Sequence, residues 1–137
     1  MVSFEVNQQA GKKIPNKVWR QWLNNIDQVV KIGPRDLSVA VVGDMVMRRL
    51  NKTYRGQDKI TDVLSFGEES RRSPYLGEVI ICYPRAVQQA KKFNHSTTTE
   101  FKKLLVHGVL HLMGYNHEID ADAEVMESLE DKIMKGK

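Results

Sequence analysis

Four short segments of the chain have the hydrophobic pattern of β-strands. Alternation of apolar and polar residues fits a strand with one buried face, whereas a short apolar run fits a strand buried on both faces. The segments predicted as strands are residues 2–6, 37–42, 63–66 and 76–82. The first alternates Val2, Phe4 and Val6 with polar residues, and the fourth ends in an apolar run from Val79 to Cys82.

Five further segments carry apolar residues at intervals of three and four, which predicts amphipathic helices. They begin near residues 16, 44, 84, 97 and 120 and run to about residues 32, 50, 93, 114 and 134. Asn16 and Asp44 can cap the first two, and residues 97–100, Thr-Thr-Thr-Glu, have the pattern of a capping box. Gly33-Pro34 is expected to end the first helix and Gly114 the fourth.

Strands mixed with helices in this order predict an α/β (α+β layered) domain. We expect a small mixed sheet of about four strands packed against about five helices. At 137 residues the chain fits a single domain, residues 1–137, that can bury a sizeable core. Residues 51–62 and 68–74 are polar, and we predict that both are loops.

Composition excludes several classes of protein. With 41% hydrophobic and 28% charged residues the chain has a globular composition, and no apolar run approaches the roughly 18 residues of a membrane span. The single cysteine, Cys82, lies in an apolar run and is interpreted as a core residue, against a metal-binding or reactive role. These features, with no signal-peptide pattern, favour a reducing, cytoplasmic setting. The net charge of +4 permits an anionic partner such as RNA without requiring one.

Three of the four histidines, His107, His111 and His117, fall within eleven residues. His107 and His111 are four apart on a predicted helix, so their rings project from one face. Gly114 then breaks the helix, which lets His117 return as a third ligand. This predicts one zinc ion with a fourth position left for water, although iron, nickel and copper also bind imidazole. The fourth histidine, His95, is interpreted as a surface residue.

The histidine spacing matches the zinc signature of metzincin proteases, His-Glu-x-x-His-x-x-Gly-x-x-His, with one departure. Gly108 stands where those enzymes carry the glutamate that acts as general base. No other residue between the two helical histidines can replace it, since Val109 and Leu110 are inert. Hydrolysis of peptides by that route is therefore not expected.

Three blocks of sequence resemble the YbeY family of bacterial endoribonucleases. Residues 107–117 read His-Gly-Val-Leu-His-Leu-Met-Gly-Tyr-Asn-His, and residues 51–66 resemble the family's arginine-containing loop and its following strand. Residues 76–81, Leu-Gly-Glu-Val-Ile-Ile, resemble its next strand, which usually has aspartate in place of Glu78. Asn116 and Gly67 also depart from the aspartate and the proline that are common in the family.

The resemblance implies a metal-dependent endoribonuclease specific for single strands. It implies action in the maturation of small-subunit ribosomal RNA and in ribosome quality control, with ribosomal RNA precursors and the ribosome as partners. Arg55 maps onto the family's functionally important arginine, and a guanidinium can grip two phosphate oxygens. By the residues alone an exposed turn residue is the favoured reading of Arg55, and only the resemblance reverses this; the general acid or base stays unassigned.

Several other residues are weaker candidates for roles around this site. Thr61, Asp62 and Ser65 are candidates for orienting the metal site or the loop, with a cap or turn as the other reading of Asp62. Some basic and aromatic residues are suited to contacting RNA, although such basic residues more often belong to a solvated surface. They are Lys52, Lys59, Arg71, Arg72, Tyr54, Tyr75 and Tyr115.

A second hypothesis from a different class stays open on the sequence. The chain could be a ribosome-assembly binding factor whose zinc is mainly structural, tying the helix to the following loop. The fourth ligand discriminates between the two, because water favours catalysis, whereas Cys82 or an acidic side chain favours a closed structural site.

Overall fold

The predicted α/β layers are present in a computed structural model of the chain, which describes residues 2–67, 74–115 and 120–136. One four-stranded mixed sheet has the order β1-β2-β4-β3. Its strands are β1 (Ser3–Gln8), β2 (Asp36–Val42), β3 (Val63–Gly67) and β4 (Tyr75–Cys82). β1, β2 and β4 run parallel, and β3 pairs antiparallel with β4 at the edge of the sheet.

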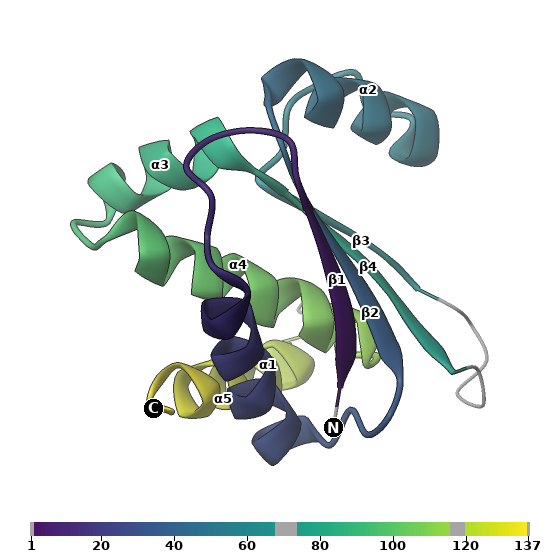
Figure 1. Cartoon of the computed structure of the whole chain (residues 1–137), viewed down its shortest axis with the longest axis vertical. Coiled ribbons are helices and arrows are strands. Elements are labelled where there is room, and N and C mark those ends of the chain that lie inside the picture. Colours follow the sequence, from purple (N-terminus) through teal and green to yellow (C-terminus); the bar gives the residue numbers. More distant parts are fainter. Residues whose placement is uncertain (1, 68–73, 116–119, 137) are drawn as a thin grey trace.

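In the part of the chain that the structure describes, five helices cover this sheet unequally. They are α1 (Asn16–Val30), α2 (Asp44–Arg55), α3 (Tyr83–Lys92), α4 (Thr97–Leu112) and α5 (Asp120–Met134). α1, α3, α4 and α5 lie on one side of the sheet, and α2 lies apart from them on the other side (Figure 1). The class of fold and the number of elements predicted from the hydrophobic pattern are confirmed.

The two faces of the sheet carry two separate cores because side chains alternate along each strand. Val39, Val41, Val79 and Ile81 face the large core under α1, α4 and α5. Val42, Ile80 and Cys82 face the small core under α2, together with Met47 and Leu64. β2 and β4 are central strands buried on both sides, which explains their nearly continuous apolar sequence.

The observed helix ends differ from the predicted ones by short steps. Asn16 is the first residue of α1 and not its cap, since Pro15 takes the cap position. Asp44 likewise follows the cap residue Gly43. α2 continues five residues beyond the predicted end, so the first part of the expected 51–62 loop is helical. The buried Asn51 supports this extension by donating to the Lys59 carbonyl at 2.9 Å.

The capping residue of α4 is Ser96, one position before the predicted capping box. Its hydroxyl accepts a hydrogen bond from the Thr99 amide at 3.0 Å. Glu100 is then free for another role: its side chain is 1% exposed and its Oε1 lies 2.5 Å from His95 Nε2. His95 lies partly exposed at the surface, with 28% of its side chain accessible, and its ring also partners this buried carboxylate.

Cys82 is a core residue, as predicted. It is fully buried beneath α2, and its thiol donates to Asp44 Oδ1 at 3.2 Å. Burial raises the pKa of the Cys82 thiol to about 12, so the reactive thiolate is scarce at neutral pH. In the described ranges no helix is long and apolar enough to cross a membrane.

Gly77 allows the close pairing of β3 with β4, which leads to a prediction. Its φ is +148°, and a Cβ there would lie 2.4 Å from the Phe66 carbonyl oxygen. We expect Gly77→Ala to lower the free energy of unfolding by about 2 kcal/mol or more, measured by urea denaturation. Gly43→Ala is the control, because a Cβ at Gly43 meets nothing within 4 Å and should cost about 1 kcal/mol or less. Equal losses for the two variants would contradict this account of the strand pairing.

Candidate metal centre

α4 ends in a motif that reverses the chain just after the histidines. Gly114 has φ +96°, and its amide donates to the His111 carbonyl at 3.0 Å. The Tyr115 amide donates to the Leu110 carbonyl, also at 3.0 Å. This pair of bonds is the Schellman arrangement, in which a glycine takes the left-handed position beyond the helix. The predicted role of Gly114 is confirmed, although the last helical residue is Leu112.

Most of α4 is buried, and the histidines occupy the strip that is not. Between positions 100 and 111 only Lys103, His107 and His111 are not buried. These three are four residues apart, so they form a single line along the helix. The two imidazoles therefore sit at the boundary between core and solvent, where a substrate can reach them.

The two rings face each other through their Nε2 atoms, which lie 3.0 Å apart. The ring centroids are 4.6 Å apart and the planes cross at 74°. Two nitrogens bound tetrahedrally to zinc at 2.0–2.1 Å would be separated by about 3.3 Å. The donor atoms therefore fit one zinc ion with a small adjustment. The carbonyl end of α4 also favours a cation at this place.

Glu130 of α5 is a site residue that the sequence reasoning missed. Its Oε1 lies 3.4 Å from His107 Nδ1. An ionised carboxylate only accepts hydrogen bonds, so a hydrogen bond at this contact requires the proton of His107 on Nδ1, which is the tautomer whose Nε2 can bind a metal. Carboxylates that hold a ligand histidine in this way are common around bound zinc.

The third predicted ligand, His117, lies outside the described residues. Within the described ranges no group of three His, Cys, Asp or Glu side chains is placed to hold a metal. The pair His107–His111 is thus the described part of the proposed ligand set, and His117 stays a prediction.

Gly108 lies where α4 crosses the sheet. A Cβ at Gly108 would be 2.8 Å from Val79 Cγ1 of β4. Such a distance is too short for any side chain, so α4 can approach the strand this closely only with glycine here. The position that carries a general base in metzincins is therefore turned into the sheet and has no room for a carboxylate.

Arg55 reaches the edge strand β3 from the opposite side of the sheet. It is the last residue of α2, not a loop residue as expected, and its Nη2 donates to the Ser65 carbonyl at 3.1 Å. Its guanidinium carbon also lies 5.8 Å from the centre of the Phe66 ring. Arg55 is exposed, so these contacts orient its guanidinium group while other N–H donors of the group stay accessible to solvent.

β3 connects Arg55 to the histidine helix. Arg55 meets the strand at Ser65, and Leu112, next to His111, lies against the strand at Gly67. Two residues of an extended strand span about 7 Å, so both segments meet the same short stretch of β3.

Asp62 has a structural role, which was one of the two alternatives considered. Its Oδ1 accepts from the Val63 amide at 2.8 Å, and Thr61 Oγ1 lies 3.4 Å from the same atom. Its Oδ2 accepts from Gln89 of α3 at 3.1 Å. These contacts fix the beginning of β3 and link it to α3, so both carboxylate oxygens of Asp62 make structural hydrogen bonds.

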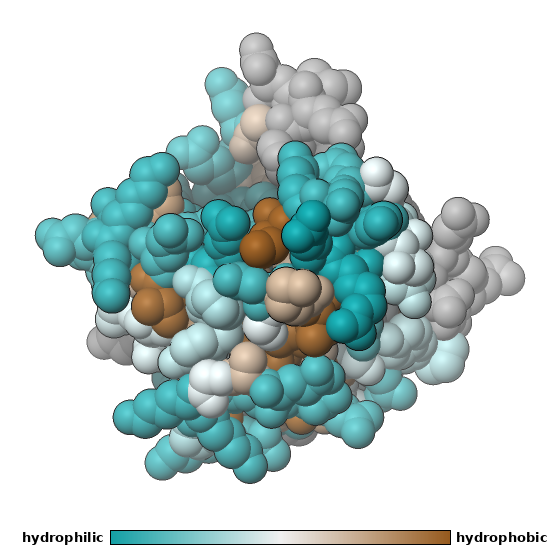
Figure 2. All heavy atoms as spheres, turned by 90° about the horizontal axis from the view of Figure 1, so that it is seen from above, coloured by the Kyte–Doolittle hydropathy of each residue, from teal (hydrophilic) through white to brown (hydrophobic). Residues whose placement is uncertain are grey.

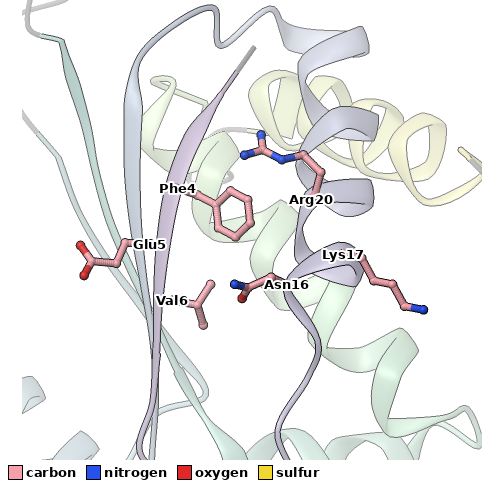
Figure 3. Close-up of a pocket in the computed structure, with 6 residues that line it drawn as sticks. All are labelled: Phe4, Glu5, Val6, Asn16, Lys17 and Arg20. Carbon is pink, nitrogen blue, oxygen red and sulfur yellow. The ribbon is translucent and has the colours of Figure 1, made fainter.

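A hollow of about 510 Å³ lies far from this site along the sheet. It is formed by β1 and α1, and Figure 3 shows Phe4 and Val6 directed toward α1 while Glu5 is directed away. Arg20 covers the Phe4 ring, with its guanidinium carbon 4.5 Å from the ring centre. β1 is the opposite edge strand from β3, so this hollow does not belong to the histidine site.

Comparison with known proteins identifies relatives over nearly the whole chain. The family described as Endoribonuclease YbeY matches residues 3–136. Proteins named Endoribonuclease YbeY from Aquifex aeolicus and Alkalilimnicola ehrlichii are 40% and 38% identical; the alignments cover 82% and 98% of this chain and 77% and 84% of those proteins. The one from Thermodesulfovibrio yellowstonii is 43% identical over 72% of this chain, and the match spans 64% of that protein's length.

A solved structure resembles the fold as a whole. The solution structure of a Thermotoga maritima protein superposes with a TM-score of 0.68 at 28% sequence identity. The match covers 98% of this chain and 87% of the other. The arrangement of sheet and helices is therefore shared with an experimentally determined protein.

The contact of Gly108 with Val79 can be tested by a double-mutant cycle. We expect Gly108→Ala to lower the free energy of unfolding by about 1–3 kcal/mol, although alanine alone would favour a helix by about 1 kcal/mol. In a Val79→Ala background the added methyl finds space, and the penalty should fall below about 1 kcal/mol. Urea denaturation of the four proteins measures both values. An unchanged penalty in the Val79→Ala background would show that the close approach is not what requires glycine.

Proposed function

The chain belongs to the YbeY family of endoribonucleases, which are hydrolases of RNA, and from this premise we propose a zinc-dependent enzyme that cuts single-stranded RNA. Its substrates would be precursors of small-subunit ribosomal RNA, and its role would extend to ribosome quality control. The ribosome would be its partner and the cytoplasm its location. The observation that carries the proposal is the pair of Nε2 atoms of His107 and His111, 3.0 Å apart at the solvent boundary.

The proposed metal ligands are His107, His111 and His117, with one zinc ion. Bound there, zinc would supply a Lewis acid for phosphodiester hydrolysis. His107 and His111 approach from one helix, and Glu130 keeps His107 in the tautomer that a metal ligand needs. Neutral histidines leave the charge of the ion undiminished, which suits a phosphate substrate.

Arg55 is the proposed catalytic residue of the chain itself. Its Nη2 is held by the Ser65 carbonyl, and the remaining guanidinium donors can bind two oxygens of a phosphate. Arginine keeps its charge throughout the reaction, so it can stabilise the charge that develops on the phosphoryl oxygens. Arg55 and Leu112, the neighbour of His111, both contact β3, which supports a shared site.

The position of Cys82 bears on the alternative of a structural zinc site. Cys82 is fully buried in the core beneath α2, whereas His107 and His111 belong to α4 on the other face of the sheet. The thiol cannot close the coordination shell of a metal on α4 without refolding of β4. This removes the sulfur ligand that would have favoured a mainly structural role.

Two alanine variants test the catalytic proposal. We expect His111→Ala and Arg55→Ala each to abolish cleavage of a single-stranded RNA by the purified protein, with zinc content lost only in the first. Arg48→Ala is the matched control, because Arg48 is an exposed arginine on the same helix that pairs with Asp58 at 2.8 Å. It should retain activity. Undiminished cleavage by the double variant of His111 and Arg55 would assign the activity to a contaminant and refute the proposal.

The orienting role of Glu130 predicts a change in metal affinity. We expect Glu130→Ala to weaken zinc binding about 10- to 100-fold, because His107 loses the acceptor that fixes its ring. Competition with a chromophoric chelator measures the dissociation constant. Glu127→Ala removes an exposed carboxylate from the same helix and should leave the affinity nearly unchanged. If both variants bind zinc equally well, the contact between Glu130 and His107 has no part in the site.

A further inference from the structure

Tyr54 is one of the most exposed large hydrophobic residues in the described part of the chain, with 63% of its surface accessible. It precedes Arg55 in the last turn of α2 and does not contribute to the core under that helix. An aromatic ring left in water at this place has no role in folding that burial would explain. Its position beside the proposed catalytic arginine calls for another function.

The Tyr54 ring is held in place by Phe66. The two ring centres are 5.0 Å apart, with the planes inclined at 54°. Phe66 also lies under Arg55, so one side chain of β3 supports both neighbouring residues of α2. A ring fixed in this way loses little further freedom when a flat ligand stacks on its open face.

The surroundings of Tyr54 are basic. Between positions 45 and 61 the chain has one acidic residue, Asp58, and it is paired with Arg48. The other basic residues of this segment are Arg49, Lys52, Arg55 and Lys59, all exposed. Seen from the α2 end, the surface is largely hydrophilic with small hydrophobic patches among the polar side chains (Figure 2). An aromatic ring among exposed cations matches the bases and phosphates of a single-stranded nucleic acid.

We propose that Tyr54 is a stacking platform for a base of the single-stranded RNA substrate, with the adjoining phosphate directed to Arg55. This rests on the proposed function for the nature of the substrate. Only an unpaired base can expose its face to the ring, so the platform would also select single strands over duplexes. Tyr54 acts by positioning RNA and takes no part in the chemical step.

Fluorescence of a Tyr54→Trp variant tests the stacking directly. The native Trp19 and Trp22 are 0% and 6% exposed, so their emission should respond little to a ligand. The probe is a short single-stranded 2′-O-methyl oligouridylate, which resists cleavage. We expect saturable quenching of the introduced indole by this probe and much weaker quenching by the matching duplex.

Met45→Trp is the matched control. Met45 is 67% exposed and lies toward the other end of the same helix, nine residues and about 14 Å before Tyr54. A tryptophan there should be quenched little at the same probe concentration. Equal quenching at the two positions would indicate collision with bound RNA and would overturn the platform.

Binding by the otherwise native chain completes the test. We expect Tyr54→Ala to weaken binding of the oligouridylate roughly five- to hundredfold, and Tyr54→Phe to keep the parent affinity. Unchanged affinity for Tyr54→Ala would overturn the proposal and would leave this surface to a protein partner. If the probe binds and quenches the indole but unmodified RNA is not cleaved, the nuclease function is refuted and the platform stands. If RNA is cleaved but Tyr54→Ala does not change the affinity for the probe, the platform is refuted and the nuclease function stands.

Discussion

The close approach of α4 to β4 at Gly108 is the contact on which the site depends. Val79 fills the space that a side chain at position 108 would need. Because the glycine must face the strand, the rotation of the helix about its axis is determined. His107 and His111 then fall on the one strip of the helix that the core does not cover. The same packing contact therefore stabilises the domain and orients the proposed ligands.

This arrangement separates two kinds of chemistry that share a histidine spacing. A glutamate at position 108 would act as the general base of a peptidase, but here this position faces the sheet and Val79 leaves no room for a side chain. The edge strand β3 instead contacts Arg55 on one side and the end of α4 on the other. A guanidinium that stays charged is suited to a phosphodiester and supplies no base for amide hydrolysis. The fold thus favours phosphate chemistry at the same pair of imidazoles.

Much of this could be predicted from the sequence because it depends on local patterns. The hydrophobic periods identified four strands and five helices, and the spacing of His107 and His111 placed both rings on one helix face. The cap of α4 was missed by one residue because the run from Ser96 to Thr99 offers several equivalent hydroxyls. The last turn of α2 was missed because its residues are polar. The hydrogen bond from the Asn51 side chain to the Lys59 carbonyl supports this turn, and the hydrophobic pattern does not reveal that contact.

The hydrophobic patterns and residue spacings could not predict contacts between elements that are distant in sequence. Glu130 is 23 residues from His107 in sequence and meets it only because α5 packs against α4. Several other carboxylates of α5 looked equivalent in the sequence. Val125, an apolar residue of that helix, is 51% exposed, which shows that periodicity alone does not place a helix against its neighbour. The side of the sheet from which Arg55 approaches likewise follows from topology.

His107 and His111 are proposed to hold a zinc ion whose coordination is completed without sulfur and with an exchangeable position. X-ray absorption spectroscopy of the zinc-loaded chain measures the ligand atoms directly. We expect a shell of nitrogen and oxygen atoms at about 2.0–2.1 Å, with the multiple-scattering pattern of imidazole rings. A sulfur shell at about 2.3 Å, or a spectrum without imidazole scattering, would contradict it.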